Sequence, residues 1–160
     1  MEEATRIVSL TAAPPLHDTS LCIVVLKSRS RESALAEITE LIGPACRDAP
    51  LLREALTRRE RLASTAIGKS LAFPNARTLA VRECRRVLAR TSRPLEWDAP
   101  DGQPVQLVCA VLSPAECSLE AHHESLARLA TPLRLARQRQ RLLDAADLDE
   151  LIELWREYLA

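Results

Sequence analysis

The sequence predicts an α/β protein in which helices cover both faces of a central sheet. Two uninterrupted apolar runs, at residues 21–26 and 105–112, are rich in β-branched residues and are typical of strands buried on both sides. The last third of the chain has the apolar spacing of three helices. Because strands that are apolar on both faces need a layer on each side, these observations together indicate a sheet between helices.

The first half of the chain supplies one strand and two helices. An irregular lead-in over residues 1–19 precedes the buried strand 21–26. Ser30 is a good N-cap for the next helix, and the Gly-Pro pair at 43–44 ends it. Pro50 opens a second helix, since proline is favoured in a first helical turn. The apolar residues at helical spacing are Leu35, Ile38, Leu41 and Ile42, and then Leu51, Leu52, Ala55, Leu56 and Leu62.

The middle of the chain gives weaker signals. Residues 63–70 are small and show no period, so we expect a loop there. Residues 71–75 have the pattern of a short strand that Pro74 stops, and residues 87–89 carry a weak strand signal. Asp101-Gly102 predicts a turn before the second buried strand.

Three helices are expected in the last third. Ser118 caps the first, which runs to Leu129, and a second is predicted over residues 132–143. Asp147 and Glu150 have the spacing of a capping box for the last helix. The apolar stripes consist of Leu119, His122, Leu126 and Leu129 in the first helix and Leu148, Leu151, Ile152, Trp155 and Leu159 in the last.

Composition limits the function. The chain of 160 residues fits one domain over 1–160, and 22 basic against 22 acidic residues argue against a nucleic-acid partner. Aromatic residues make up 2%, too few for a base-stacking surface. Three glycines are too few for a phosphate-binding or dinucleotide loop, so no cofactor is expected.

Cysteine usage and apolar run length predict a cytoplasmic protein without membrane insertion, because there is no CxxC pair, signal peptide or membrane-length segment. Cys22 and Cys109 lie inside the apolar runs and are expected to be buried. No metal site is predicted: His122 and His123 are adjacent on a helix and point in different directions, and no cysteine or carboxylate cluster completes a site.

Motifs along the chain resemble a known family. Residues 59–68 are Arg-Glu-Arg-Leu-Ala-Ser-Thr-Ala-Ile-Gly, and residues 71–77 are Leu-Ala-Phe-Pro-Asn-Ala-Arg. They are similar to the active-site segment of the EIIA domain of the bacterial phosphotransferase system, in its fructose/mannitol and nitrogen-regulatory class. Residues 101–105 and 114–130 resemble two further signatures of that family, and the resemblance covers the chain from residue 21 onward.

The resemblance implies a mixed sheet sandwiched between helices and a site built for phosphoryl transfer. In active members a histidine accepts a phosphoryl group from the carrier protein HPr, and passes it to an EIIB cysteine or keeps it as a regulatory mark. An arginine, a hydroxyl and a second histidine stabilise the phosphoryl oxygens. Arg59, Thr65 and His122 match these three positions, so we expect them to line one shallow pocket together with Asn75.

Asn75 stands where the resemblance places the phosphorylated histidine. Its amide nitrogen lone pair is delocalised into the carbonyl, so it cannot form a phosphoryl intermediate, and no catalytic residue is expected. Ala66 and Ser70 replace two glycines of the family pattern. If those glycines need positive φ, the loop is expected to follow a different path.

Each pocket residue also has a structural explanation. Asn75 could be a turn residue bonded to local backbone, and His122 a satisfied helix histidine. Arg59 could be one more solvated arginine, and Thr65 a helix-end hydroxyl. Three arginines on one face of the predicted helix 132–143 fit either a solvated surface or a docking patch for an acidic partner; they are Arg134, Arg137 and Arg141.

Two functions stay open. The first is a regulatory protein-binding module that cannot be phosphorylated, with neutral Asn75 standing in for an unphosphorylated imidazole. The second is a phosphocarrier that takes a phosphoryl group from HPr on His122. Loss of the nucleophile together with the loop glycines favours the first. The expected partners are proteins, either phosphotransferase components or a regulated kinase or transporter.

Overall fold

The computed structural model describes residues 21–43 and 46–159, so the predicted lead-in lies outside the described residues. One strand and two helices come first, five consecutive strands follow, and helices form the rest of the described chain. In chain order the elements are β1 (Leu21–Leu26), α1 (Arg31–Ile42), α2 (Ala49–Leu62), β2 (Ala66–Gly68), β3 (Leu71–Ala72), β4 (Asn75–Thr78), β5 (Arg85–Leu95), β6 (Val105–Pro114), α3 (Leu119–Ala130), the 3-10 helix η2 (Thr131–Arg134), α4 (Ala136–Asp144) and α5 (Leu148–Leu159).

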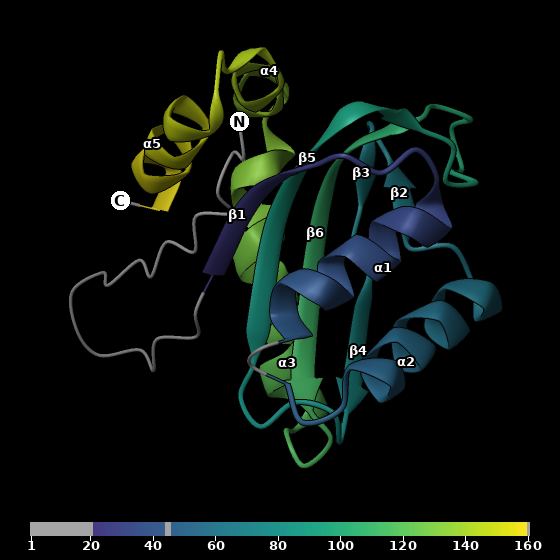
Figure 1. Cartoon of the computed structure of the whole chain (residues 1–160). Helices are drawn as coiled ribbons and strands as arrows, with labels where there is room; N and C mark the ends of the chain where they lie inside the picture. Colours follow the sequence, from purple (N-terminus) through teal and green to yellow (C-terminus); the bar gives the residue numbers. More distant parts are fainter. Residues whose placement is uncertain (1–20, 44–45, 160) are drawn as a thin grey trace, which may run out of the picture.

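The strands form one mixed sheet, as predicted (Figure 1). The order is β1-β5-β6-β3-β2, with β4 also paired to β6. Strand β5 runs parallel to β1 and antiparallel to β6, whereas β3 and β4 both run parallel to β6. Strands β3 and β4 therefore follow one another along the same edge of β6. Strand β2 pairs antiparallel with β3.

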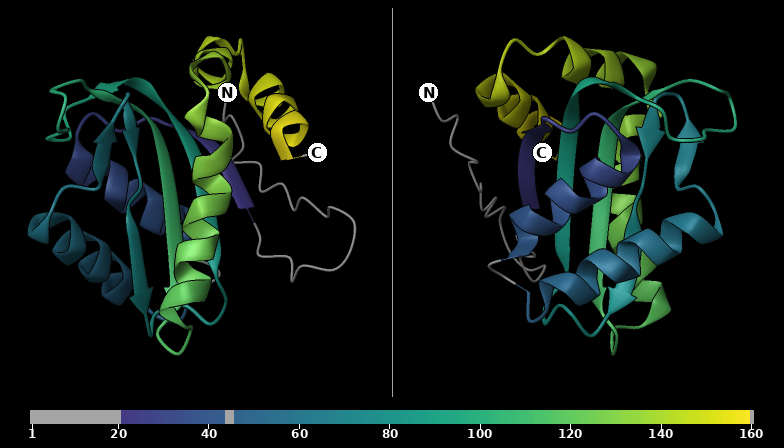
Figure 2. Two further views of the ribbon diagram at one scale, coloured as in Figure 1. Left: turned by 180° about the vertical axis from the view of Figure 1, so that it is seen from behind. Right: turned by 45° about the vertical axis from the view of Figure 1, so that its right-hand side comes forward.

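Helices cover both faces of the sheet. Helices α1 and α2 pack on one face, and α3, α4 and α5 lie on the other (Figures 1 and 2). Alternate residues of β6 enter the two cores: Val108 and Ala110 pack on the α1–α2 side, and Cys109 and Val111 on the α3–α5 side. This two-sided burial explains why the strand is apolar at every position from 107 to 112.

The predicted helix caps are confirmed. The Ser30 and Ser118 hydroxyls each accept a hydrogen bond from a first-turn backbone N–H. Asp48 caps α2, with Pro50 in the first turn. At α5 the Asp147 carboxylate accepts a hydrogen bond from the Glu150 N–H. The Glu150 carboxylate accepts one from the Ala146 N–H, and not from the Asp147 N–H as in a standard capping box.

Several strand boundaries differ from the prediction. The loop expected at 63–70 contains β2, and the strand expected at 71–75 is two strands, with β4 beginning after Pro74. The weak signal at 87–89 lies in the first half of the 11-residue β5. Residues 86–91 of β5 pair with β1, and residues 85–90 pair with β6 on the other side. This two-sided pairing stabilises a strand whose own residues favour one only weakly.

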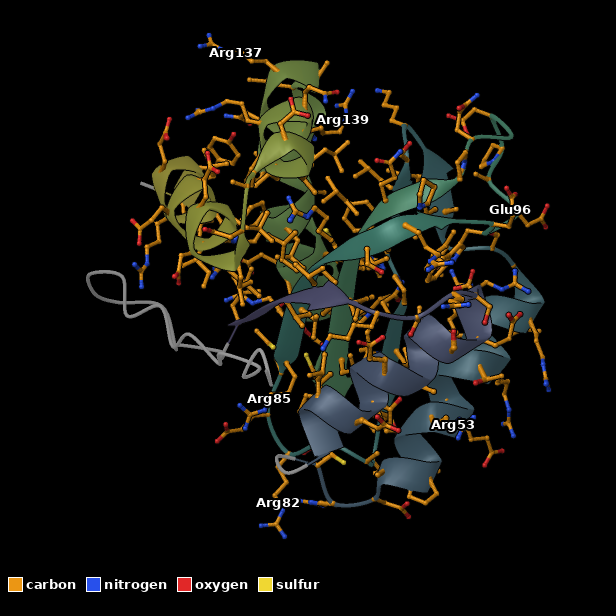
Figure 3. The ribbon with its side chains drawn as sticks, turned by 45° about the horizontal axis from the view of Figure 1, so that its top comes forward. Arg53, Arg82, Arg85, Glu96, Arg137 and Arg139 are labelled. Carbon is orange, nitrogen blue, oxygen red and sulfur yellow. The ribbon has the colours of Figure 1, made fainter. Side chains whose placement is uncertain are left out.

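The helix predicted over 132–143 is broken. Leu135 has an extended backbone, with φ −84° and ψ 122°, and separates η2 from α4. The Arg139 guanidinium donates to the carbonyls of residues 133 and 134, which the break leaves without helical partners. Arg134 and Arg137 therefore lie on different helices, and Arg137 projects into solvent (Figure 3). Arg141 forms an ion pair with Glu157 of α5.

The two cysteines of the apolar runs differ in burial. Cys109 is fully buried, as expected, and burial raises the pKa of its thiol. Cys22 is only half-buried, which corrects the expectation. The difference arises because β1 is an edge strand among the described strands, paired with β5, whereas Cys109 lies in the middle of the sheet on β6.

The turn between β2 and β3 has a left-handed backbone that includes two residues other than glycine. Gly68, Lys69 and Ser70 have φ values of 90°, 57° and 62°. The Asp101 carboxylate accepts the Lys69 N–H at 2.8 Å, and the Ser70 carbonyl accepts from residues 106 and 107. These contacts hold Ser70 at positive φ despite its Cβ. Ser70 therefore adopts the left-handed region without glycine, whereas Ala66, the other changed position, lies in β2 and is not among the described residues with positive φ.

The strain at Ser70 predicts a stabilising substitution. Ser70→Gly is expected to raise the free energy of unfolding relative to Ser70→Ala by about 1 kcal/mol, because only glycine adopts positive φ without a steric penalty. Urea unfolding of both variants measures the difference. Equal stabilities would show that the turn carries no such strain.

Candidate functional site

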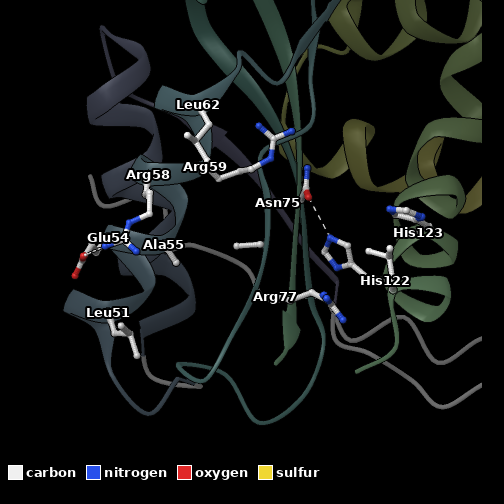
Figure 4. A pocket seen from close by; sticks show the side chains of 12 residues that line it. Leu51, Glu54, Ala55, Arg58, Arg59, Leu62, Asn75, Arg77, His122 and His123 are labelled. Atoms are coloured by element: carbon white, nitrogen blue, oxygen red, sulfur yellow. Dashed lines mark hydrogen bonds and ion pairs between the residues drawn. The ribbon is translucent and has the colours of Figure 1, made fainter. Parts of the chain in front are cut away.

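A groove of about 600 Å³ lies along β4, between α2 on one side and α3 on the other (Figure 4). It brings together three of the four predicted pocket residues: Arg59 from α2, Asn75 from β4 and His122 from α3. Thr65 does not line it. The groove forms because β4 is the short outer strand at this end of the sheet, so the two helical layers meet beyond its edge.

Asn75 is the first residue of β4, and its side chain amide is fixed at both ends. The amide nitrogen donates to the Phe73 carbonyl at 2.8 Å, and the amide oxygen lies 3.0 Å from His122 Nε2. A carbonyl only accepts hydrogen bonds, so the nitrogen of Asn75 must face Phe73 and the oxygen must face His122. Both the local backbone contact and the pocket location expected for Asn75 are therefore present.

His122 connects α3 to the sheet. Its side chain is buried, and its Nδ1 lies 2.8 Å from the Ser113 hydroxyl at the end of β6. Because Asn75 presents an oxygen, Nε2 must carry the hydrogen and donate it. In the neutral ring Nδ1 then accepts from Ser113. One chain of hydrogen bonds thus runs from Ser113 through the imidazole and Asn75 to the Phe73 carbonyl.

The surroundings of His122 favour its neutral form. Burial lowers the pKa of His122, and the nearby charges of His123 and Arg77 lower it further. His123 itself is exposed on the helix surface. The imidazole is therefore an uncharged hydrogen-bonding group at neutral pH.

Arg59 supplies positive charge to the groove. It lies in the last turn of α2, and its guanidinium donates to the Ala63 carbonyl at 2.9 Å, which satisfies the helix end. The side chain extends toward Asn75 (Figure 4). Within the described residues no carboxylate forms an ion pair with it, whereas its neighbour Arg58 pairs with Glu54 at 2.7 Å.

Thr65 belongs to a buried network behind the groove. Its hydroxyl donates to Glu60 at 2.5 Å and its backbone N–H donates to the same carboxylate at 2.8 Å. The Trp97 indole N–H donates to Glu60 as well, at 2.8 Å. Sequence reasoning missed Glu60, although it continues the buried stripe of Leu52 and Leu56 at four-residue spacing.

Arg77 also lines the groove and was not predicted. It lies two residues after Asn75 on β4, and its guanidinium donates to the Cys117 carbonyl at 2.8 Å. The period of two along a strand could have placed it beside Asn75, on the same face of β4. Among the described residues, as for Arg59, it has no carboxylate partner.

The described part of the chain has neither a cluster of potential metal ligands nor a membrane-spanning helix. Within residues 21–43 and 46–159, no group of three or more histidine, cysteine or acidic residues is placed to hold a metal ion. Among the helices described there, none has the length and apolar character needed to cross a membrane.

Residues 17–158 match the model of the family described as phosphoenolpyruvate-dependent sugar phosphotransferase system, EIIA 2. The chain belongs to this family. The matched segment includes all twelve residues that line the groove. The groove is therefore a feature of the EIIA 2 domain itself.

Relatives of this EIIA 2 chain fall into two groups. The fructose-specific EIIABC component of Bacillus subtilis is 30% identical over 131 residues, which cover 81% of this chain and 20% of that protein. This chain thus spans about a fifth of that relative. The nitrogen regulatory protein of Pseudomonas aeruginosa is 31% identical over 134 residues, covering 82% and 86% of the two chains. The crystal structure of nitrogen regulatory protein IIA-Ntr from Neisseria meningitidis superimposes with a TM-score of 0.75 at 28% identity, covering 88% and 92%.

The Glu60 network predicts a large loss of stability when its carboxylate is removed. Glu60→Leu leaves three buried donors without an acceptor, so the free energy of unfolding is expected to fall by at least about 3 kcal/mol. Glu54→Leu, on the exposed face of the same helix, is the matched control and is expected to change stability little. Urea unfolding of the two variants tests this, and equal losses would contradict it.

The lowered pKa of His122 predicts a pH-dependent contribution to stability. His122 has a lower pKa in the folded chain than in the unfolded chain, where its ordinary value is 6.5, so the unfolded chain binds a proton first as the pH falls. The stabilisation of the folded state by neutral His122 is therefore complete above pH 6.5 and is lost as the pH falls through the folded pKa. The variant His122→Gln keeps a donor but does not titrate. Wild type is expected to lose stability relative to this variant as the pH falls below the ordinary value of 6.5, as measured by urea unfolding. Parallel pH profiles would refute this.

Proposed function

We propose that this EIIA 2 chain is a regulatory protein-binding module that does not carry a phosphoryl group, with Asn75 at the position of the family's phosphorylated histidine. The hydrogen bond between His122 Nε2 and Asn75 Oδ1 carries this proposal. Asn75 is one of the residues that line the groove, and its side chain is an amide, which is not a nucleophile. Arg59 and His122 lie around it as the family resemblance predicts.

The contacts of His122 argue against the alternative phosphocarrier. A phosphoryl acceptor needs an imidazole nitrogen with an accessible lone pair. Nε2 carries the hydrogen that it donates to Asn75, and the Nδ1 lone pair accepts from Ser113 in the interior. Phosphorylation of His122 would have to break one of these bonds and expose a buried ring. These contacts support a structural role for His122, which positions the Asn75 side chain.

The proposed partner is a protein that contacts the surface around Asn75. The relatives include a component of a sugar transport system and a nitrogen regulatory protein. We therefore propose phosphotransferase components, or a kinase or transporter under their regulation, as the partner classes, in the cytoplasm. In this scheme Asn75 holds the surface in a form like that of an unphosphorylated domain.

Phosphoryl transfer from HPr tests the proposal. The wild-type chain, incubated with phosphoenolpyruvate, Enzyme I and HPr, is expected to take up no acid-labile phosphate, because Asn75 has no nucleophilic nitrogen. Labelling of HPr in the same reaction is the internal control. Stoichiometric labelling of the chain that disappears in His122→Ala would overturn the proposal.

The variant Asn75→His extends the same test. It restores an imidazole beside Arg59 and His122, so it is expected to be labelled. Labelling is expected to be slow, since misplacement of reacting groups by about 1 Å can cost about a hundredfold in rate. The measurement is acid-labile radioactivity over time. Complete absence of labelling would contradict this expectation and would indicate that HPr no longer recognises the surface around position 75.

A further inference from the structure

The outer edge of β4 presents unpaired backbone groups to the groove. The Pro74 carbonyl accepts a hydrogen bond from residue 111 of β6, and the Thr78 carbonyl accepts one from residue 115, which directly follows β6. Because successive residues of a strand direct their backbone groups to opposite sides, the N–H and C=O of Asn75 and Arg77 point away from β6. Within the described residues, no other element forms a hydrogen bond with these four groups.

Among the described elements, no strand occupies the position beside this edge. Strand β2 occupies the corresponding position beside β3, and the pairing ends where the Phe73 N–H donates to the Thr65 carbonyl. From Asn75 onward, no strand among those described follows β4 on this side. The sheet is thus one strand wider at its β2 end than at its β4 end.

The walls of the groove combine apolar and cationic side chains. Leu62 of α2 is 79% exposed and Leu119 of α3 is 53% exposed, and both line the groove. Arg59 and Arg77 carry positive charge there, and neither has a carboxylate partner in the described part of the chain. Apolar walls, uncompensated cations and free backbone groups together fit an extended segment that bears acidic residues.

We propose that the groove binds an extended, acidic segment of a partner protein, which adds to the sheet as a new strand along β4. Backbone hydrogen bonds to Asn75 and Arg77 set its register, and carboxylates of the segment pair with Arg59 and Arg77. Its apolar side chains cover Leu62 and Leu119. The inference deepens the proposed function, since it states how a regulatory partner is recognised at the same site.

A pair of variants at Arg77 isolates the backbone contact. Arg77→Ala removes the guanidinium but keeps the N–H, whereas Arg77→Pro removes both. The N–H of Arg77 is not part of the β6 ladder, and proline is tolerated at such an edge position. Thermal unfolding of both variants reports whether the fold is retained.

The probe is a library of random dodecapeptides displayed on phage and selected on the wild-type chain. Selected peptides are expected to contain acidic and β-branched residues and to bind Arg77→Pro about tenfold more weakly than Arg77→Ala, the effect of one lost backbone hydrogen bond. Binding to Arg59→Ala is expected to be weaker than binding to wild type. Two further peptides carry methyl groups on their odd-numbered or on their even-numbered backbone nitrogens. Only one of these two sets of N–H groups faces β4 in an added strand, so only one of the two peptides is expected to lose binding. This comparison tests strand addition even if Arg77→Pro unfolds.

Three results would overturn the inference. They are a selection that yields no peptide, equal binding to Arg77→Ala and Arg77→Pro when both variants fold, and equal binding by the two methylated peptides. Each leaves the proposed function standing, because that depends on the absence of phosphoryl transfer from HPr. Conversely, labelling of the wild-type chain would remove the proposed function without affecting the peptide measurements.

Discussion

The buried carboxylate of Glu60 determines where the groove can form. It accepts hydrogen bonds from the backbone and hydroxyl of Thr65 and from the indole of Trp97, so one side chain joins α2, the segment leading into β2 and the segment after β5. Arg59 precedes it in the same helical turn. The position of the cation at the groove is therefore a consequence of the buried anion behind it.

A second constraint operates across the groove. His122 joins α3 to β6 through Ser113 and to β4 through Asn75, so the helix and both strands share one set of hydrogen bonds. The Phe73 carbonyl fixes the Asn75 nitrogen as a donor and the Asn75 oxygen as an acceptor, so His122 Nε2 donates. In the neutral ring Nδ1 then accepts from the Ser113 hydroxyl. A neutral imidazole satisfies all of these roles, which agrees with the burial of the ring and the lowered pKa.

Local features were predictable from the sequence and long-range features were not. The caps at Ser30 and Ser118 and the apolar strand 105–112 depend on neighbouring residues, and the structure confirms them. The length of β5 depends on two partner strands, so a weak local pattern concealed it. The family resemblance placed Arg59, Asn75 and His122 in one pocket. It could not reveal that Thr65 turns inward, because that depends on a carboxylate which Trp97 reaches from 37 positions away.

The exposed edge of β4 also bears on the behaviour of the chain in concentrated solution. Open strand edges flanked by apolar residues are sites of aggregation, because two copies can pair edge to edge. Here such pairing would bring Arg59 and Arg77 of one copy close to the same residues of the other, and in the described part of the chain neither arginine has a carboxylate partner. The two arginines thus discourage self-association at the edge where the sheet is incomplete. Selectivity at this edge follows from repulsion of the chain's own copies as much as from attraction of a partner.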